Sequence, residues 1–111
     1  MITGDQFAEM ALSFPGTEQV PHFERTGFKV TGRRMFATYL ETNNTANIFL
    51  NPVEQQVFCE IDKDHIFPVP NKWGEKGATT FVLDHVDQGV ILEALSSAYA
   101  ETKKGKQKRS N

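Results

Sequence analysis

Two short segments of this 111-residue chain bring cationic, amide and aromatic side chains close together. Arginine and lysine contact phosphate oxygens, asparagine can contact a phosphate or the edge of a base, and tryptophan can stack on an unpaired base. Glycines within both segments let a ligand come close to the backbone. The candidate binding residues in these segments are Arg33, Arg34, Asn71, Lys72, Trp73 and Lys76.

A purely structural role for the same residues is the open alternative. Lysine and arginine are mostly exposed in folded proteins, so the cations can be ordinary solvated turn residues. Trp73 would then be a hydrophobic lid over an edge of a sheet. Because loops on a rigid scaffold often carry function, both interpretations stand at this point.

The single cysteine, Cys59, is expected to be a half-buried structural residue. A cysteine nucleophile needs a neighbouring base or cation to form its thiolate. Cys59 follows Phe58 in a predicted helix, and the histidines, His22, His65 and His85, are scattered along the chain. One cysteine cannot form an internal disulfide, which favours a reducing cytoplasmic location.

An acidic group, Glu60, Asp62 and Asp64, lies at the end of that helix and is followed by His65. Metal ligands must converge on one point, whereas these side chains alternate around a helix end and a turn. The segment also lacks the glycine and the later glutamate of an EF-hand loop. We therefore expect a solvated turn and no metal site.

The sequence contains no phosphate-binding loop, dinucleotide fingerprint, serine-centred nucleophile elbow or paired-cysteine metal motif. We accordingly expect no catalytic residue and no cofactor, and a binding protein in place of an enzyme. The N-terminus lacks the pattern of a secretory signal, and no apolar run approaches the roughly 20 residues needed to cross a bilayer.

The net charge of −2 hides an uneven distribution along the chain. Five of the 12 basic residues lie at or after Lys103, so seven remain in the preceding body against 14 acidic residues. Affinity for nucleic acid comes chiefly from positive charge that meets phosphate. An acidic body therefore opposes nucleic-acid binding unless the basic residues gather on one face.

Hydrophobic periodicity predicts three helices and five strands. Thr3 and Gln6 fit a capping box at the start of the first helix, with Ile2 and Phe7 as its hydrophobic staple. Asn51 and Pro52 suit the start of the second, which would bury Val53, Val57, Phe58 and Ile61. The last helix follows Asp87 and would bury Ile91, Ala94, Leu95 and Ala98. Strands are expected near 22–30, 34–41, 46–50, 65–69 and 79–84, and Pro68 makes the fourth of them an edge or bulged strand.

This order, α-β-β-β-α-β-β-α, predicts an α+β fold: a two-layer sandwich with a mostly antiparallel sheet and helices on one face. Residues 31–33 read as a hairpin turn and residues 70–77 as a loop. We expect one domain over residues 1–102 and a basic disordered tail over residues 103–111.

Four segments in this order resemble the MmcQ/YjbR family over most of the chain. The resemblance implies a fold like that of bacterial secretion chaperones, and DNA binding through two "wings", residues 31–34 and 70–77. Many relatives have a histidine between the lysine and tryptophan of the second wing, whereas Trp73 directly follows Lys72 here. The matching segments are residues 14–18, 35–37, 69–74 and 79–83.

Two other classes of function remain open at this stage. The chain can be a protein-interaction or chaperone-like module that presents an open sheet face, with Phe28, Tyr39 or Phe49, to a protein partner or a second copy in a homodimer. It can also hold a small ligand in a cleft between helix and sheet, which requires a deep pocket with convergent polar groups. No membrane partner is expected.

Overall fold

A six-stranded sheet is the central element of the fold. The structure is a computed structural model that describes the backbone of residues 1–109 and the side chains of residues 1–104. The strands are β1 (Thr17–His22), β2 (Arg25–Val30), β3 (Met35–Leu40), β4 (Thr45–Phe49), β5 (Ile66–Pro68) and β6 (Ala78–Val82). They lie in the order β1-β2-β3-β4-β6-β5, and every neighbouring pair is antiparallel. The helices are α1 (Gly4–Ala11), α2 (Pro52–Cys59), α3 (Lys72–Glu75) and α4 (Gln88–Arg109).

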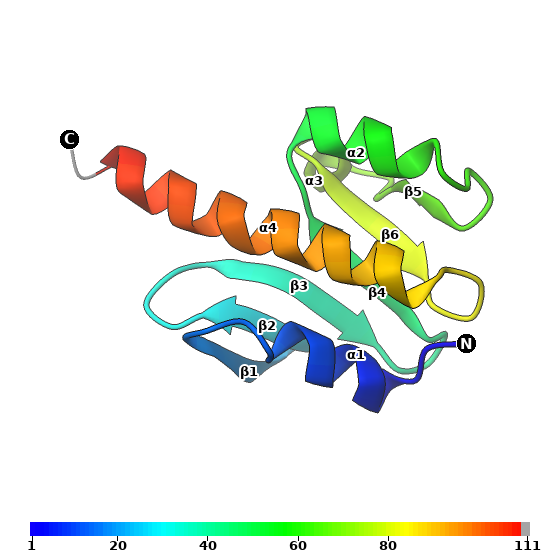
Figure 1. The fold of residues 1–111 in the computed structure, drawn as a ribbon, viewed down its shortest axis with the longest axis horizontal. Coiled ribbons are helices and arrows are strands. Elements are labelled where there is room, and N and C mark those ends of the chain that lie inside the picture. Colours follow the sequence, from blue (N-terminus) through cyan, green and yellow to red (C-terminus); the bar gives the residue numbers. More distant parts are fainter. Residues whose placement is uncertain (110–111) are drawn as a thin grey trace.

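Helices α1 and α4 lie across the same face of the sheet (Figure 1). The Phe7 ring of α1 is 5.6 Å from the Phe28 ring of β2, and the Phe58 ring of α2 is 6.2 Å from that of Phe81 in β6. Helix α2 therefore belongs to the same layer. The predicted α+β sandwich with a mostly antiparallel sheet is confirmed.

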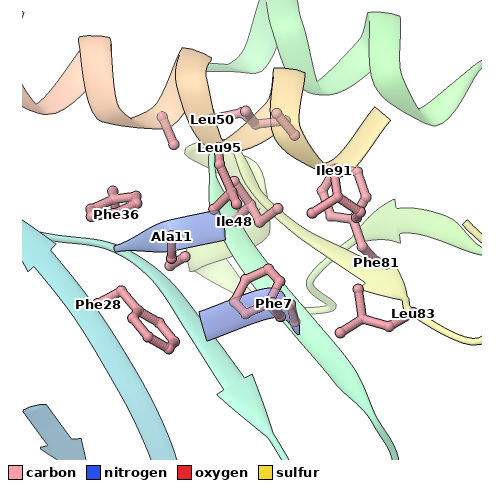
Figure 2. Packing of buried hydrophobic residues seen from close by; sticks show 14 of the residues in the cluster. Phe7, Ala11, Phe28, Phe36, Ile48, Leu50, Phe81, Leu83, Ile91 and Leu95 are labelled. Carbon is pink, nitrogen blue, oxygen red and sulfur yellow. The ribbon is translucent and has the colours of Figure 1, made fainter. Parts of the chain in front are cut away.

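The core fills the space between this helix layer and the sheet (Figure 2). Full burial of a large apolar side chain contributes about 1.5–3 kcal/mol, so these contacts dominate the stability of the domain. The stripe predicted for α4 is completely buried, which confirms its periodicity. The core includes Phe7, Phe28, Phe36, Ile48, Phe81, Leu83, Ile91, Ala94, Leu95 and Ala98.

The predicted helix starts are confirmed by their caps. The Thr3 hydroxyl accepts from the Gln6 backbone N–H at 3.1 Å, and the Gln6 side chain accepts from the Thr3 N–H at 2.9 Å. Asn51 Oδ1 accepts from the Glu54 N–H at 2.9 Å, and Pro52 occupies the first turn of α2. Each cap satisfies a backbone donor that would otherwise lack a helical partner.

The structure adds two elements to the predicted order. A strand and a hairpin turn precede β2, because the chain reverses at Phe23, which adopts φ 59°. A phenylalanine at positive φ gives no turn signal in the sequence, unlike glycine or asparagine. The second added element is α3, a single helical turn in the second wing. Asn71 caps its start, because Asn71 Oδ1 accepts from the Trp73 N–H at 2.9 Å.

The stripe predicted to be buried on α2 is wrong in three of its four positions. Phe58 is buried, but Val53, Val57 and Ile61 are 73%, 60% and 55% exposed. Helix α2 lies beside β5 at the edge of the sheet, so only its Phe58 side meets a second layer. The periodicity of apolar residues does not indicate which side of a helix packs against another layer of the fold.

A bulge in β3 decides which residues face the helices. Phe28 pairs with Ala37 and Lys29 with Met35, so Phe36 is an extra residue in the ladder. Phe36 and Ala37 are both buried. The open face was expected to present Phe28, Tyr39 or Phe49, but Phe28 and Tyr39 pack against Phe7 of α1. The register leaves Phe49 on the opposite face of the sheet, half-buried.

Helix α4 continues through Lys103 to Arg109, where the sequence led us to expect a disordered tail. Thr102 is buried and its hydroxyl donates to the Ala98 carbonyl at 3.1 Å. Lysine, glutamine and arginine, which follow it, are good helix formers. Ser110 and Asn111 lie outside the described residues. None of the helices in the described residues has both the length and the apolar composition required to cross a membrane.

Candidate functional site

The two wings lie at the same end of the sheet. Lys29 pairs with Met35 beside the first wing, and Phe49 pairs with Ala78 beside the second. Because every neighbouring pair of strands is antiparallel, one edge of the sheet contains the last residues of β2 and β4 and the first residues of β3 and β6. We refer to this edge as one end of the sheet. Neighbouring strands are about 4.8 Å apart, so β3 and β6, with β4 between them, are roughly 10 Å apart.

The C-terminal half of α4 reaches the same end, toward the left in Figure 1. The Tyr99 hydroxyl donates to the Pro15 carbonyl at 2.7 Å, just before β1 begins, and its ring lies 6.1 Å from that of Phe36. Lys103 and Lys104 follow on this helix and are exposed. We call this the basic end, formed by Lys29, Arg33, Arg34, Lys72, Lys76, Lys103 and Lys104.

Carboxylates gather at the opposite end of the sheet. This end contains the β1–β2, β3–β4, α2–β5 and β6–α4 connections and the start of α1. Two cations, Arg25 and Lys63, also lie there. We call it the acidic end, formed by Asp5, Glu24, Glu41, Asp62, Asp64, Asp84 and Asp87.

The pKa of the Tyr39 hydroxyl is raised by burial and by the carboxylates of the acidic end. Burial raises the pKa of its hydroxyl, and the carboxylates of Glu41, Asp84 and Asp5 raise that pKa further. A tyrosinate would carry negative charge into a region that is already negative, so the neutral form is favoured. The raised pKa of Tyr39 is therefore consistent with the negative charge of the acidic end.

The cations of the basic end are not neutralised by ion pairs. Among the side chains described up to Lys104, the one contact at ion-pair distance is the hydrogen bond between His65 Nδ1 and Asp62 Oδ2, 2.9 Å long, at the acidic end. Carboxylates do occur near the basic end, on Glu18, Glu54, Glu75 and Glu101. None of them lies within ion-pair distance of a described lysine or arginine.

The candidate residues differ in how freely a ligand can reach them. Arg33 is half-buried, and its backbone N–H donates to the Val30 carbonyl at 2.8 Å to close the first wing. The side-chain oxygen of Asn71 is used to cap α3. The remaining four candidates, Arg34, Lys72, Trp73 and Lys76, are exposed.

Trp73 does not act as a lid, because 66% of it is exposed. The Nζ atom of Lys76 lies 5.6 Å from the centroid of its ring, within the range of a cation–π contact. The structural alternative for this residue, a hydrophobic cover over the sheet edge, is therefore wrong.

Sequence reasoning overlooked Lys29 as part of the basic end. Lys29 lies inside the predicted strand rather than in the turn, and its pairing with Met35 puts it one residue before the end of β2, beside the first wing. Lys103 and Lys104 were assigned to a separate tail, whereas they continue the last helix toward the same end.

The other reactive side chains do not form a comparable site. Cys59 is half-buried, and burial raises the pKa of its thiol, which disfavours the thiolate that a nucleophile requires. The His65 and His85 rings stack at 4.2 Å. Within the described residues, no group of three or more histidine, cysteine or acidic side chains is arranged to hold a metal ion.

A pocket of about 360 Å³ opens between α1 and the first three strands. Its walls include Asp5, Glu41, Gln19, Thr26 and Tyr39. Two carboxylates in such a small space repel an anionic ligand. The cations of the two wings lie at the other end of the sheet from this pocket.

Comparison with known proteins identifies the fold. The family model described as YjbR matches residues 12–101. The crystal structure of Deinococcus radiodurans protein DR2400, with the family-model domain DUF419, is similar at a TM-score of 0.76 and 24% sequence identity. The similar region covers 89% of this chain and 77% of that chain. No curated protein matches this chain.

Proposed function

This chain belongs to the YjbR family, and from its distribution of charge we propose that it binds nucleic acid, most simply DNA, through the basic end. The observation that carries the proposal is the gathering of unpaired cations from β2, both wings and α4 at one end of the sheet. Each cation that meets a phosphate releases a condensed counterion, and this release drives affinity.

The acidic end supports the same proposal by fixing the orientation of the complex. A polyanion is attracted by one end of the sheet and repelled by the other, so it approaches in one direction. The net charge of −2 therefore does not prevent binding, and affinity should fall with rising salt because the attraction between cations and phosphates weakens. We further propose a role in binding, without catalysis, in the reducing cytoplasm, which the half-buried Cys59 supports.

The test compares two double variants that remove the same charge. Arg33→Ala with Arg34→Ala removes two cations from the basic end, and Arg25→Ala with Lys63→Ala removes two from the acidic end. Fluorescence polarisation with labelled DNA at low salt should show several-fold weaker binding for the first pair only. The slope of log affinity against log salt should also become shallower for that pair.

Equal losses for both pairs would show that net charge alone matters, and the proposal of a basic-end site would be dropped. Because Arg25 also donates to the Thr38 hydroxyl at 3.3 Å, the melting temperature of both double variants must be measured alongside.

A second candidate function rests on the sheet face that α1, α2 and α4 leave uncovered. Five half-buried apolar residues from four strands lie on it, which suits a protein partner or a second copy. Sedimentation equilibrium should then detect a dimer that Phe49→Lys disrupts and Gln19→Lys does not. A monomer at all accessible concentrations would remove the homodimer version. The residues are Val20, Met35, Leu40, Phe49 and Val82.

A further inference from the structure

The basic end contains an aromatic side chain that phosphate binding does not explain. Trp73 is 66% exposed, is adjacent to Lys72 and carries Lys76 against its ring. Resting on the proposed function, we infer that Trp73 makes this site selective for single-stranded nucleic acid by stacking on an unpaired base.

Trp73 is held on a rigid support, although α3 is only one turn long. Gln55 Nε2 on α2 donates to the carbonyls of Gly74 and Ala78 at 2.9 and 3.0 Å. Gly74 packs so closely on the residue that follows β5 that a Cβ there would come within 1.7 Å of the Val69 carbonyl oxygen. The backbone that presents the indole is therefore ordered before any ligand arrives, which lowers the entropy cost of stacking.

The surroundings of the indole suit a nucleotide better than an apolar partner. Lys72 and Lys76 are exposed beside it, and Lys76 Nζ lies 5.6 Å from the ring centroid. A base that stacks on the indole brings its own phosphates within reach of these cations. An apolar protein segment would instead have to desolvate both ammonium groups without a partner.

The single-strand preference follows from what each form of nucleic acid presents. In a duplex the bases are paired and stacked on each other, so only their edges are accessible in the grooves. A duplex base must be unpaired and unstacked before it can reach Trp73. Every base has a flat face, so stacking on Trp73 should tolerate any sequence.

The experiment uses the full chain and two fluorescein-labelled probes of about 12 nucleotides, oligothymidine and a mixed-sequence duplex. The wild-type protein should bind oligothymidine several-fold tighter than the duplex. Trp73→Ala should weaken oligothymidine binding roughly tenfold and leave duplex binding nearly unchanged. Trp73→Phe should keep most of the affinity, since it keeps an aromatic face.

Phe23→Ala is the matched control, because Phe23 is 96% exposed but lies in the β1–β2 turn at the acidic end. It should leave both affinities unchanged. Since Trp73 is the single tryptophan of the chain, quenching of indole fluorescence by unlabelled oligothymidine reports directly on this side chain.

The outcomes separate the two proposals. If Trp73→Ala weakens both probes equally or neither, single-strand selectivity is overturned, and sensitivity of duplex binding to the Arg33→Ala, Arg34→Ala pair would still support the proposed function. If neither probe binds at low salt, both proposals fail.

Discussion

At Gly77 the backbone adopts φ +120°, and a Cβ added there would lie 1.9 Å from the carbonyl oxygen of Leu50. The neighbour is backbone, which cannot move aside as a flexible side chain can. This glycine joins α3 to β6, so the second wing depends on it for its position.

We predict that Gly77→Ala destabilises the fold by about 2 kcal/mol or more, through backbone strain and steric overlap. Gly16→Ala is the control, because Gly16 has φ +72° but no atom within 4 Å of the added Cβ. That change should cost about 1 kcal/mol, from the left-handed backbone alone. Thermal unfolding of both variants checks the difference, and equal melting temperatures would contradict it.

The Asp62–His65 contact makes a prediction about pH. The hydrogen bond from His65 is the main reason that the pKa of the Asp62 carboxyl lies below its ordinary value. A carboxyl whose pKa is lowered by folding stabilises the fold above its unfolded pKa of about 3.9, and this stabilisation is lost as pH falls through the lowered folded pKa.

An NMR titration of the Asp62 carboxyl should therefore have a midpoint below that of an ordinary aspartate. In His65→Ala the midpoint should move up toward the ordinary value, because the donor is removed. An unchanged midpoint in that variant would assign the low pKa to the backbone N–H groups of Asp64 and His65.

Among single residues, sequence reasoning identified the candidate types but not their accessibility. The residue type of Trp73 is the same whether the side chain covers the sheet or points into solvent, and its 66% exposure is known only from the structure. Asn71 was expected to contact a ligand, yet its side-chain oxygen has a local backbone partner.

At the scale of elements, α2 and β3 show where periodicity is insufficient. An apolar stripe marks a helix, but burial requires a second layer, and the edge position of α2 depends on the order of strands far away in the sequence. The bulge at Phe36 shifts the alternation of β3, so the consecutive residues Phe36 and Ala37 are buried together. Helix caps, in contrast, are local and were predicted correctly.

We predict that Val57→Lys on α2 changes the free energy of unfolding by no more than about 0.5 kcal/mol, because the side chain is already in water. Phe58→Ala, one position away, should cost about 3–5 kcal/mol because it leaves a cavity against Phe81. Chemical denaturation measures both values. A large loss in Val57→Lys would indicate that the exposed stripe is covered in solution.

For the whole molecule, the separation of charge could not be predicted from composition. The body is acidic on average, and only the neighbouring positions of β4 and β6 in the sheet bring the second wing to the end that holds the first. The central strands have five or six residues, so the two ends of the sheet are roughly 17–20 Å apart, about two Debye lengths at 0.1 M salt. The charges of the two ends therefore largely act on a charged ligand separately.

The central claim is that the basic end is where nucleic acid binds, and amide chemical-shift mapping with unlabelled oligothymidine tests it most directly. We predict that the shifted amides belong to residues 31–34, 71–77 and the α4 segment near Tyr99 to Lys104. The amides of residues 23–24, 41–44 and 84–87 should stay in place. Shifts concentrated at the acidic end, or no shifts at low salt, would contradict the account.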